Sequence, residues 1–372
     1  MTVLSFEERL SNRQREFDEI LRLRELLSAS NIDWKWLRYH KRPSLPATAY
    51  DVAMGSLYAA WLVWREKIDV VHSRGYVPLP IALFCKWLCR AKLVFDVRGL
   101  MAEEYVDAGH WKQGSLPFRI TKWFEKRAFR SADSIIVLTD RIREILKSQS
   151  AAPMQTIPCC VEVERFGNKG EREVVRQELG ISGDPVLVYV GSLGTWYMGQ
   201  EMVKTFKELL RVHPQATFLV LTQSPEIAER LFEQEQLPKE RYLARTVKSE
   251  EVPRYLAAAD LAIAFIKPCY SKISSSPTKI AEYLAAGLPF ISNRGIGDLD
   301  ELIEGNAVGT LVNAFDENGY AAAVQSVLQM IQHDPTVRDR CRALAKQKFS
   351  MHDIGQPAYV SVYRELGNAP RR

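Results

Sequence analysis

The sequence lacks the features that mark metal, redox and dinucleotide sites. Its six cysteines form no Cys-x-x-Cys pair and few histidines lie near them, which argues against a zinc site. There is no Gly-x-Gly-x-x-Gly fingerprint and no Walker loop. We therefore expect no metal and no cofactor, and we expect the thiols to be reduced in a cytoplasm.

Long apolar runs are also missing. Two prolines and three basic residues interrupt the longest candidate, Val77–Phe95, so it cannot span a bilayer. The first residues turn polar after one short apolar run, and we expect no signal peptide. No low-complexity tract or short repeat is present. The 372 residues, 47% apolar and 26% charged, are typical of a soluble protein with more than one domain.

Charge is distributed unevenly along the chain. Residues 1–165 contain 26 Lys and Arg against 20 Asp and Glu, a formal charge of +6, and the remainder carries −1. Together with the aromatic-basic run Trp34–Arg42, this bias predicts contact with an anionic membrane surface. The alternative is an ordinary solvated surface, with Trp34 and Trp36 on a half-buried strand.

Short β-rich runs alternate with amphipathic helical stretches. This alternation predicts two parallel sheets wrapped by helices, an α/β fold with two Rossmann-like, doubly wound domains. A polar stretch follows Phe166, and the domain boundary is expected near Phe166–Glu173. The expected strands are residues 2–6, 33–39, 69–73, 92–98 and 134–139 in the first half, and 186–191, 217–222, 261–266 and 289–293 in the second.

Ligands of such sheets bind where strands end and helices begin. In the segment 274–287, three serines precede Pro277, which suits the first turn of a helix. The helix N-terminus beside Lys272 and Lys279 is a candidate anion site, and Lys279 is expected to be solvated. Glu282, about one and a half turns further, could accept hydrogen bonds from a vicinal diol such as a ribose. The alternative is a capped helix with a surface carboxylate.

The loop after strand 186–191 is a second candidate. Gly191 and Gly194 allow a ligand to approach the backbone closely, although a tight turn explains them equally well. Asp298 and Asp300 form an Asp-x-Asp pair that could bind a metal. We favour a helix start there, because acidic residues are favourable at helix N-termini.

The donor-loop pattern, Ser-Ser-Pro-x-Lys and then Glu-Tyr-Leu-Ala-Ala-Gly-x-Pro, resembles the signature of GT-B glycosyltransferases, in particular the retaining family-4 (group 1) enzymes. Further segments match in order, among them "VVHSRGYVP", "FDVRGLMAEE", "DSIIVLT", "TIPCCVEVERF" and "YVGSLGTWYMG". The resemblance implies an acceptor-side domain (1–168), a nucleotide-sugar-binding domain (169–350) and a terminal helix (351–372) that crosses back.

The resemblance also implies roles for individual residues. Donor binding falls to Gly191, Ser192, Gly194, Lys272, Ser274, Ser275, Ser276, Thr278, Lys279 and Glu282, and the base would lie near Thr222, Val247 and Lys248. Catalysis is assigned to Arg98, Asp96 and Glu104, with His72, Arg74 and Glu103 on the acceptor side.

Four departures from the family pattern stand out. Ser274, Ser192 and Arg98 occupy positions where the family often has Glu, Arg and His. The chain also starts at what resembles the family's second strand, so we expect either a truncated start or an N-terminal sheet without the family's first strand and its glycine-bearing loop.

The implied reaction moves a sugar from an NDP-sugar to a hydroxyl with retention, at the inner face of the plasma membrane. The acceptor would be a glycan or lipid-linked saccharide of envelope polysaccharide synthesis, not a nucleic acid. Two alternatives remain. One is a sugar-nucleotide 2-epimerase on the same fold, and the other is a non-catalytic subunit that binds nucleotide-sugar.

Overall fold

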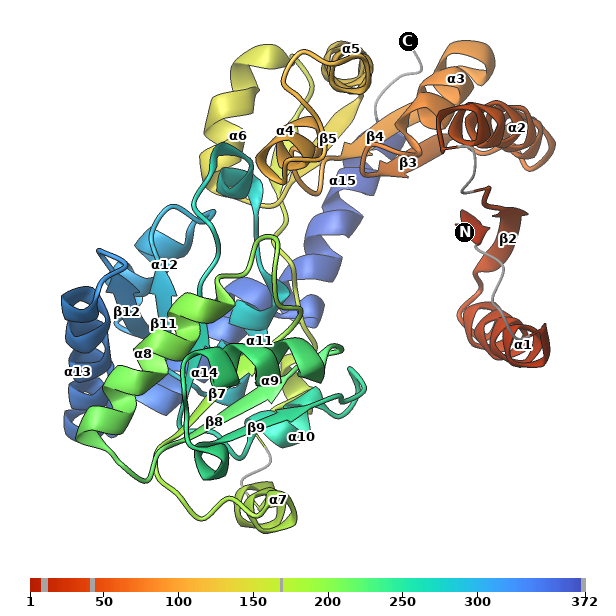
Figure 1. Ribbon diagram of the computed structural model, residues 1–372. Helices are drawn as coiled ribbons and strands as arrows, with labels where there is room; N and C mark the ends of the chain where they lie inside the picture. The colour runs from red at the N-terminus through yellow and green to blue at the C-terminus, as the bar shows by residue number, and fades with distance from the viewer. Residues whose placement is uncertain (8–12, 41–43, 168–169, 369–372) are drawn as a thin grey trace.

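The computed structural model describes residues 1–7, 13–40, 44–167 and 170–368. It shows two α/β halves side by side (Figure 1). The first half contains β1 (Thr2–Glu7), α1 (Arg13–Ala29), β2 (Asp33–Arg38), α2 (Ser44–Arg65), β3 (Val70–Arg74), α3 (Leu79–Cys89), β4 (Lys92–Asp96), α4 (Met101–Asp107), α5 (Leu116–Ser131), β5 (Ser134–Val137), α6 (Asp140–Leu146) and β6 (Met154–Thr156).

The main N-terminal sheet has four parallel strands in the order β3-β4-β5-β6. Its central strands are apolar on both faces because helices cover both, as parallel sheets require. Phe95 and Ile135 pack toward one helix layer, and Val94 and Ile136 pack toward the other. This places the ends of β3, β4 and β5 along one edge, which faces the second domain.

β1 and β2 form a separate two-stranded parallel sheet (Figure 1). A doubly wound sheet has the strand order 3-2-1-4-5-6. In that order β2 and β1 take places 3 and 2, and β3 takes place 4. The break between β1 and β3 therefore falls at place 1 of that order. The small sheet rests on α2 through Phe6, whose ring lies against Gly55 beside Ile81.

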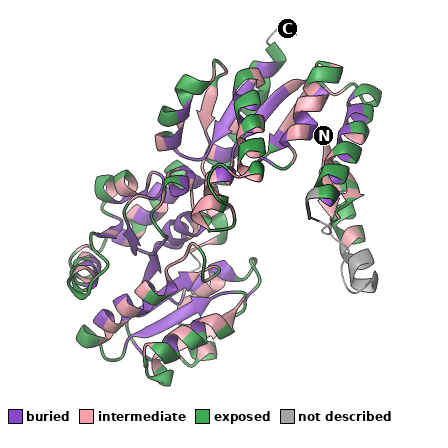
Figure 2. Ribbon diagram, turned by 45° about the horizontal axis from the view of Figure 1, so that its top comes forward, coloured by how far each residue is buried: buried purple, intermediate pink, exposed green. Residues whose placement is uncertain are grey.

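The second half is a larger parallel sheet in the order β12-β11-β10-β7-β8-β9. Figure 2 shows its strands buried between helices whose outer sides are exposed. The elements are α7 (Glu171–Leu179), β7 (Val186–Val190), α8 (Gly199–Val212), β8 (Thr217–Leu221), α9 (Pro225–Gln234), β9 (Tyr242–Arg245), α10 (Val252–Leu256), β10 (Leu261–Ala264), α11 (Thr278–Ala286), β11 (Phe290–Asn293), α12 (Leu299–Asn306), β12 (Gly309–Val312), α13 (Glu317–His333) and α14 (Val337–Phe349).

The chain returns to the first domain at its end. After α14, a turn at Met351–Gly355 leads into α15 (Gln356–Asn368). Val362 and Leu366 of α15 pack against Val94 and Ile136 of the N-terminal sheet. The last helix therefore ties the two domains together (Figure 1).

Several elements were not anticipated from the sequence. The polar stretch after Phe166 contains helix α7, which is held to β10 by Arg172 and Arg176 on the carboxylate of Asp260. Strands β6, β9 and β12 are short edge or near-edge strands that the apolar pattern missed. No helix among the described residues combines the length and apolarity needed to cross a bilayer.

Candidate donor site and interdomain cleft

Residues 267–277, called the donor loop below after the expected role, lead into the N-terminus of α11. Pro277 precedes this helix, and no side chain caps it. Two of the preceding serines are already engaged. Ser274 Oγ donates to the carbonyl of Ser271 (2.7 Å), and Ser276 Oγ accepts from the amide of Cys159 (3.2 Å). The side chains of Ser275 and Thr278 form no hydrogen bond with the described residues, and Thr278 is exposed. An uncapped helix start of this kind has amides that can bind an anion.

Lys279 lies in an aromatic cage beside this helix start. Its Nζ donates to the hydroxyl of Tyr189 (2.9 Å) and lies 3.6 Å from the centre of the Tyr197 ring. The side chain is 7% exposed, so the expectation of a solvated lysine was wrong. Burial lowers the pKa of Lys279 to about 7, and the nearby Glu282 only partly opposes this shift. The cage keeps a titratable amine next to the uncapped start of α11.

The glycine loop after β7 closes over Lys279. A Cβ on Gly191 would lie 2.8 Å from Lys279 Nζ, and Gly191 has a φ of +129°. Both features require glycine there. Tyr189 also donates to the carbonyl of Ser192 (2.5 Å), so one phenol positions both the lysine and the loop. Gly194, with a φ of +93°, faces open space.

Glu282 lies one turn beyond Lys279 on α11. Its carboxylate makes no hydrogen bond or ion pair with the part of the chain that the structure describes. Burial raises the pKa of Glu282, while Lys279 and Arg165 act in the opposite direction. A half-buried acceptor without a protein partner is available to hydroxyl donors of a ligand.

Lys272 connects the two domains across the cleft. Its Nζ contacts Glu104 Oε1 of α4 at 2.9 Å and lies 4.0 Å from the centre of the Trp196 ring. The neighbouring amide of Ser271 donates to Asp107 (3.2 Å). Lys272 is 7% exposed and, like Lys279, is not solvated. Glu104 is thereby brought to the donor loop, although it lies 168 positions away in sequence.

The acceptor-side candidate His72 and the catalytic candidates Asp96 and Arg98 form one cluster beside α15. Asp96 Oδ2 accepts from the hydroxyl of Tyr359 (3.1 Å) and lies 3.6 Å from His72 Nε2 and 4.0 Å from Arg98. Arg98 has a φ of +57° and also donates to the Cys159 sulfur (3.4 Å). Asp96 Oδ1 is buried without a partner. Tyr359 of α15 and Cys159 of the interdomain segment therefore both contact this cluster.

The remaining predicted residues come from α4 and from the ends of β3, β8 and β9. Glu103 contacts Lys122 of α5 (2.7 Å), and Arg74 is exposed at the end of β3. Thr222 and Val247 are buried just after β8 and β9, and Lys248 is exposed. The amide of Gly191 donates to the carbonyl of Leu221, so the Thr222 loop borders the glycine loop.

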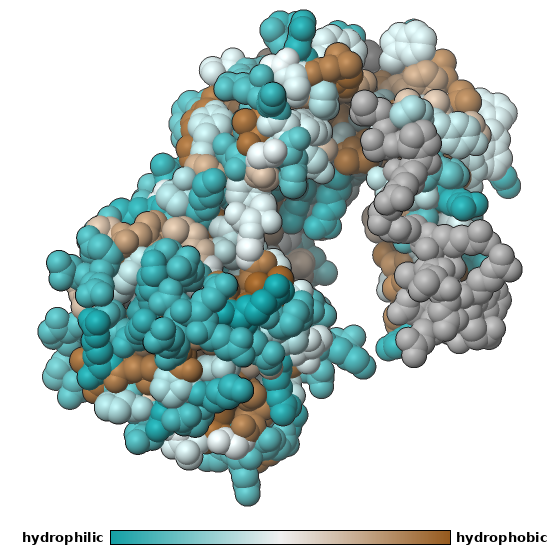
Figure 3. All heavy atoms as spheres, viewed as in Figure 1, coloured by the Kyte–Doolittle hydropathy of each residue, from teal (hydrophilic) through white to brown (hydrophobic). Residues whose placement is uncertain are grey.

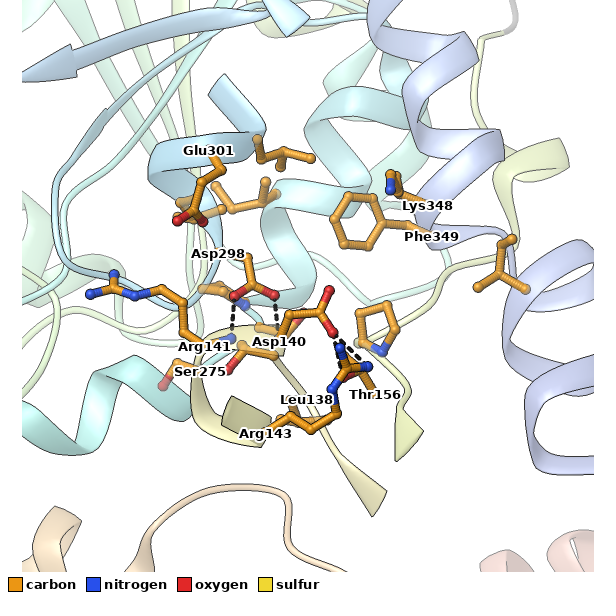
Figure 4. A pocket seen from close by; sticks show the side chains of 18 of the residues that line it. Leu138, Asp140, Arg141, Arg143, Thr156, Ser275, Asp298, Glu301, Lys348 and Phe349 are labelled. Carbon is orange, nitrogen blue, oxygen red and sulfur yellow. Dashed lines mark hydrogen bonds and ion pairs between the residues drawn. The ribbon is translucent and has the colours of Figure 1, made fainter. Parts of the chain in front are cut away.

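A cavity of about 800 Å³ opens beside the α11 start (Figure 4). Its lining includes Pro277 and Ile280 but neither Lys279 nor Glu282. In Figure 4 the Asp298 carboxylate points at the start of α6, where it accepts from the amides of Asp140 (2.7 Å) and Arg141 (3.0 Å).

Asp300, the second acid of the Asp-x-Asp pair, accepts from the amide of Gly295 (3.1 Å). Both acids of the pair are thus engaged with backbone amides. Across the described residues, no three metal-ligating side chains come together.

Sequence reasoning missed the aromatic residues around the lysines. Tyr189, Trp196 and Tyr197 come from β7 and its loop, and Tyr283 on α11 accepts from the amide of Val190 (3.0 Å). The only signal was the phrase "GTWYMG", in which two aromatic residues follow a glycine loop.

Two family models match the chain. Residues 184–330 match the family model "Glycosyl transferases group 1", and residues 9–165 match "Glycosyltransferase Family 4". The two matches together cover most of the chain. The protein belongs to the family-4, group 1 glycosyltransferases, whose fold is GT-B.

Individual relatives are distant. The chain is 22% identical to an alpha-D-kanosaminyltransferase of Streptomyces kanamyceticus over 67% of its own length and 64% of that protein's. It is 29% identical to TuaC of Bacillus subtilis, a putative teichuronic acid biosynthesis glycosyltransferase, over 45% of its length and 40% of TuaC's. The matches thus span less than two thirds of the length of either relative.

Among solved structures, Anabaena Alr3699/HepE in complex with UDP-glucose superimposes with a TM-score of 0.70. The match covers 98% of this chain and all of that one at 16% identity. At that identity the likeness establishes the fold alone.

Proposed function

We propose that this protein transfers a sugar from an NDP-sugar to a hydroxyl acceptor. The observation that carries the proposal is the grouping of Lys279, the uncapped α11 start and the unpaired Glu282 on one helix end. Amides and an amine suit a diphosphate, and a free carboxylate suits a ribose diol. HepE has been solved with UDP-glucose on the same fold, which supports a nucleotide-sugar donor.

The chemistry follows from where negative charge develops. When the bond to the sugar breaks, the leaving diphosphate gains charge, and fixed donors beside it stabilise the transition state. In this proposal Lys279 and the α11 amides take this role, which is supported by their position at one helix end. Because this arrangement supplies no evident protein nucleophile, we infer attack by the acceptor on the face that the leaving group vacates, with retention at the anomeric carbon.

The acceptor belongs to the N-terminal side of the cleft. We infer a saccharide or a lipid-linked saccharide of envelope polysaccharide synthesis, delivered at the inner face of the membrane. The positive charge of residues 1–165 and the similarity to TuaC support this choice.

The test combines donors and acceptors in a matrix. UDP-, GDP-, ADP- and TDP-sugars are incubated with and without lipid-linked saccharides, and the released nucleoside diphosphate and the product's anomeric configuration are measured by NMR. Acceptor-dependent release with a retained anomer supports the proposal. Epimerised sugar without an acceptor would instead identify an epimerase, and binding without turnover would identify a non-catalytic subunit.

Glu282→Ala serves as the matched loss-of-site variant in this matrix. The exposed Glu240, on the surface of the same domain, provides a control of equal charge as Glu240→Ala.

A further inference from the structure

Helix α2 exposes an apolar face that nothing in the described residues covers. Tyr50, Met54, Leu57, Trp61 and Trp64 follow one another at spacings of three and four, so they lie in one stripe, and all are exposed. Trp64 is 77% exposed. Among the exposed residues of α2 from Pro46 onward, the only charged one is Arg65, whose guanidinium lies 4.8 Å from the centre of the Trp61 ring.

Helices α3 and α5 extend this surface. α3 contacts both α2 and α5, and it exposes Trp87 (74%) next to Leu88. Figure 3 shows brown and near-white side chains at the upper right edge, over α2 and α3. Three of the eight tryptophans in the chain, Trp64, Trp87 and Trp123, thus stand out from neighbouring helices.

Helix α5 adds positive charge. Its exposed residues are Leu116, Arg119, Ile120, Trp123, Lys126, Arg127 and Arg130, three apolar and four basic, with none acidic. Its one acid, Glu125, is buried and bound to Tyr76 and Lys122. Within the described part of the chain, no ion pair is formed by the four exposed basic residues. This composition is typical of helices that lie in a membrane interface.

We propose that α2, α3 and α5 form a membrane-docking face that binds bilayers with anionic headgroups. The tryptophans would enter the headgroup region, and the unpaired basic residues of α5 would meet the lipid charge. A protein partner would need acidic residues opposite each of the four unpaired basic residues, whereas an anionic bilayer supplies negative charge across its whole surface. The face is separate from the run Trp34–Arg42, in which Trp34 donates to Ser5 (2.9 Å) and residues 41–42 lie outside the described residues.

The position of this face deepens the proposed function, on which it rests for its biological sense. Lys122 of α5 contacts Glu103 of α4, and the next residue, Glu104, contacts Lys272 of the donor loop. The docking face is therefore one helix away from the cleft. A lipid-linked acceptor could reach the donor while its lipid stays in the bilayer.

The experiment measures binding to phosphatidylcholine vesicles with and without phosphatidylglycerol, by co-sedimentation at low and raised salt. Each basic residue near an anionic surface strengthens binding about fivefold, so Lys126→Gln, Arg127→Gln and Arg130→Gln together should weaken it about 100-fold. Trp64→Ser, Trp87→Ser and Trp123→Ser together should abolish measurable binding.

Matched controls come from elsewhere on the surface. Trp36→Ser removes a half-exposed tryptophan of β2, and Lys239→Gln with Lys346→Gln removes two exposed basic residues of the other domain. These controls should bind as the unchanged protein does. Nucleoside diphosphate binding, measured by calorimetry, should be equal in all variants, which separates this proposal from the donor-site proposal.

Two results would overturn the docking face. The first is that the unchanged protein stays in the supernatant with anionic vesicles at low salt, or that the control variants lose as much vesicle binding as the α5 and tryptophan variants do. The other is a dimer that becomes a monomer in the tryptophan variant while vesicle binding is unaltered. That outcome would make the face a contact between two copies of this chain.

Discussion

Replacing the caged lysine by methionine tests the donor site most sharply. In the folded protein the pKa of Lys279 is about 7, against an ordinary value of 10.5. Between these values the unfolded chain binds a proton that the folded chain does not, so stability rises with pH across this window. The cost of burying Lys279 is fully present below about pH 7, and it amounts to roughly 5 kcal/mol at 1.36 kcal/mol per pH unit.

Lys279→Met keeps the aliphatic stem and removes this cost. Loss of the hydrogen bond to Tyr189 lowers the free energy of unfolding by about 1 kcal/mol, so the variant should be more stable by several kcal/mol in total. At about 2–4 °C per kcal/mol, the variant should melt on the order of 10 °C higher near neutral pH. The difference should shrink toward zero near pH 10, which thermal denaturation across pH measures.

Ligand binding should raise the lowered pKa of Lys279 again. A diphosphate beside Lys279 favours the charged amine and raises its pKa, so a proton is taken up on binding. Calorimetry with UDP, GDP, ADP and TDP, in buffers of different ionisation enthalpy, should show uptake of about one proton near pH 8 and almost none near pH 6. Lys279→Met should bind weakly and take up none.

Two glycine variants provide a matched pair for this test. Gly191→Ala and Gly194→Ala both place a side chain at positive φ, but only Gly191→Ala crowds Lys279. We expect Gly191→Ala alone to disturb proton uptake. A Lys279→Met protein that melts at the same temperature as the unchanged protein at every pH, with identical proton uptake, would refute the reasoning.

Three further predictions concern other parts of the molecule. Glu282→Ala should weaken the binding of NDP-sugars and of bare nucleoside diphosphates alike by roughly 10- to 100-fold in calorimetry, because a hydrogen bond to a charged acceptor is lost. Unchanged affinity would remove the ribose assignment. Arg98→Lys keeps the charge but loses the planar fork between Asp96 and Cys159, so turnover should fall sharply while donor binding persists; full turnover would contradict a role at the cleft. The amides of β1 and β2 should exchange hydrogen faster than those of β3–β5, because a two-stranded sheet is marginally stable, and equal protection by mass spectrometry would show that the small sheet is held as firmly as the large one.

The sequence by itself determined the class of fold and the family. Apolar strands such as 186–191 and 261–266 alternate with amphipathic helices, and this local periodicity needs no knowledge of distant contacts. The donor-loop pattern around Pro277 and Glu282 is also local, so its helix start could be predicted directly. Strand β12 and helix α7 escaped because short edge strands and polar helices carry weak periodic signals.

Only the tertiary structure decided the environment of the charged residues. Burial and pairing depend on which loops meet, and sequence spacing does not contain that information. Lys279 looked solvated until β7 brought Tyr189 and Tyr197 around it, and Lys272 looked free until α4 brought Glu104 across the cleft. The apolar face of α2 could likewise be recognised as uncovered only once the neighbouring helices were in place, because a stripe of that spacing is usually buried in a core.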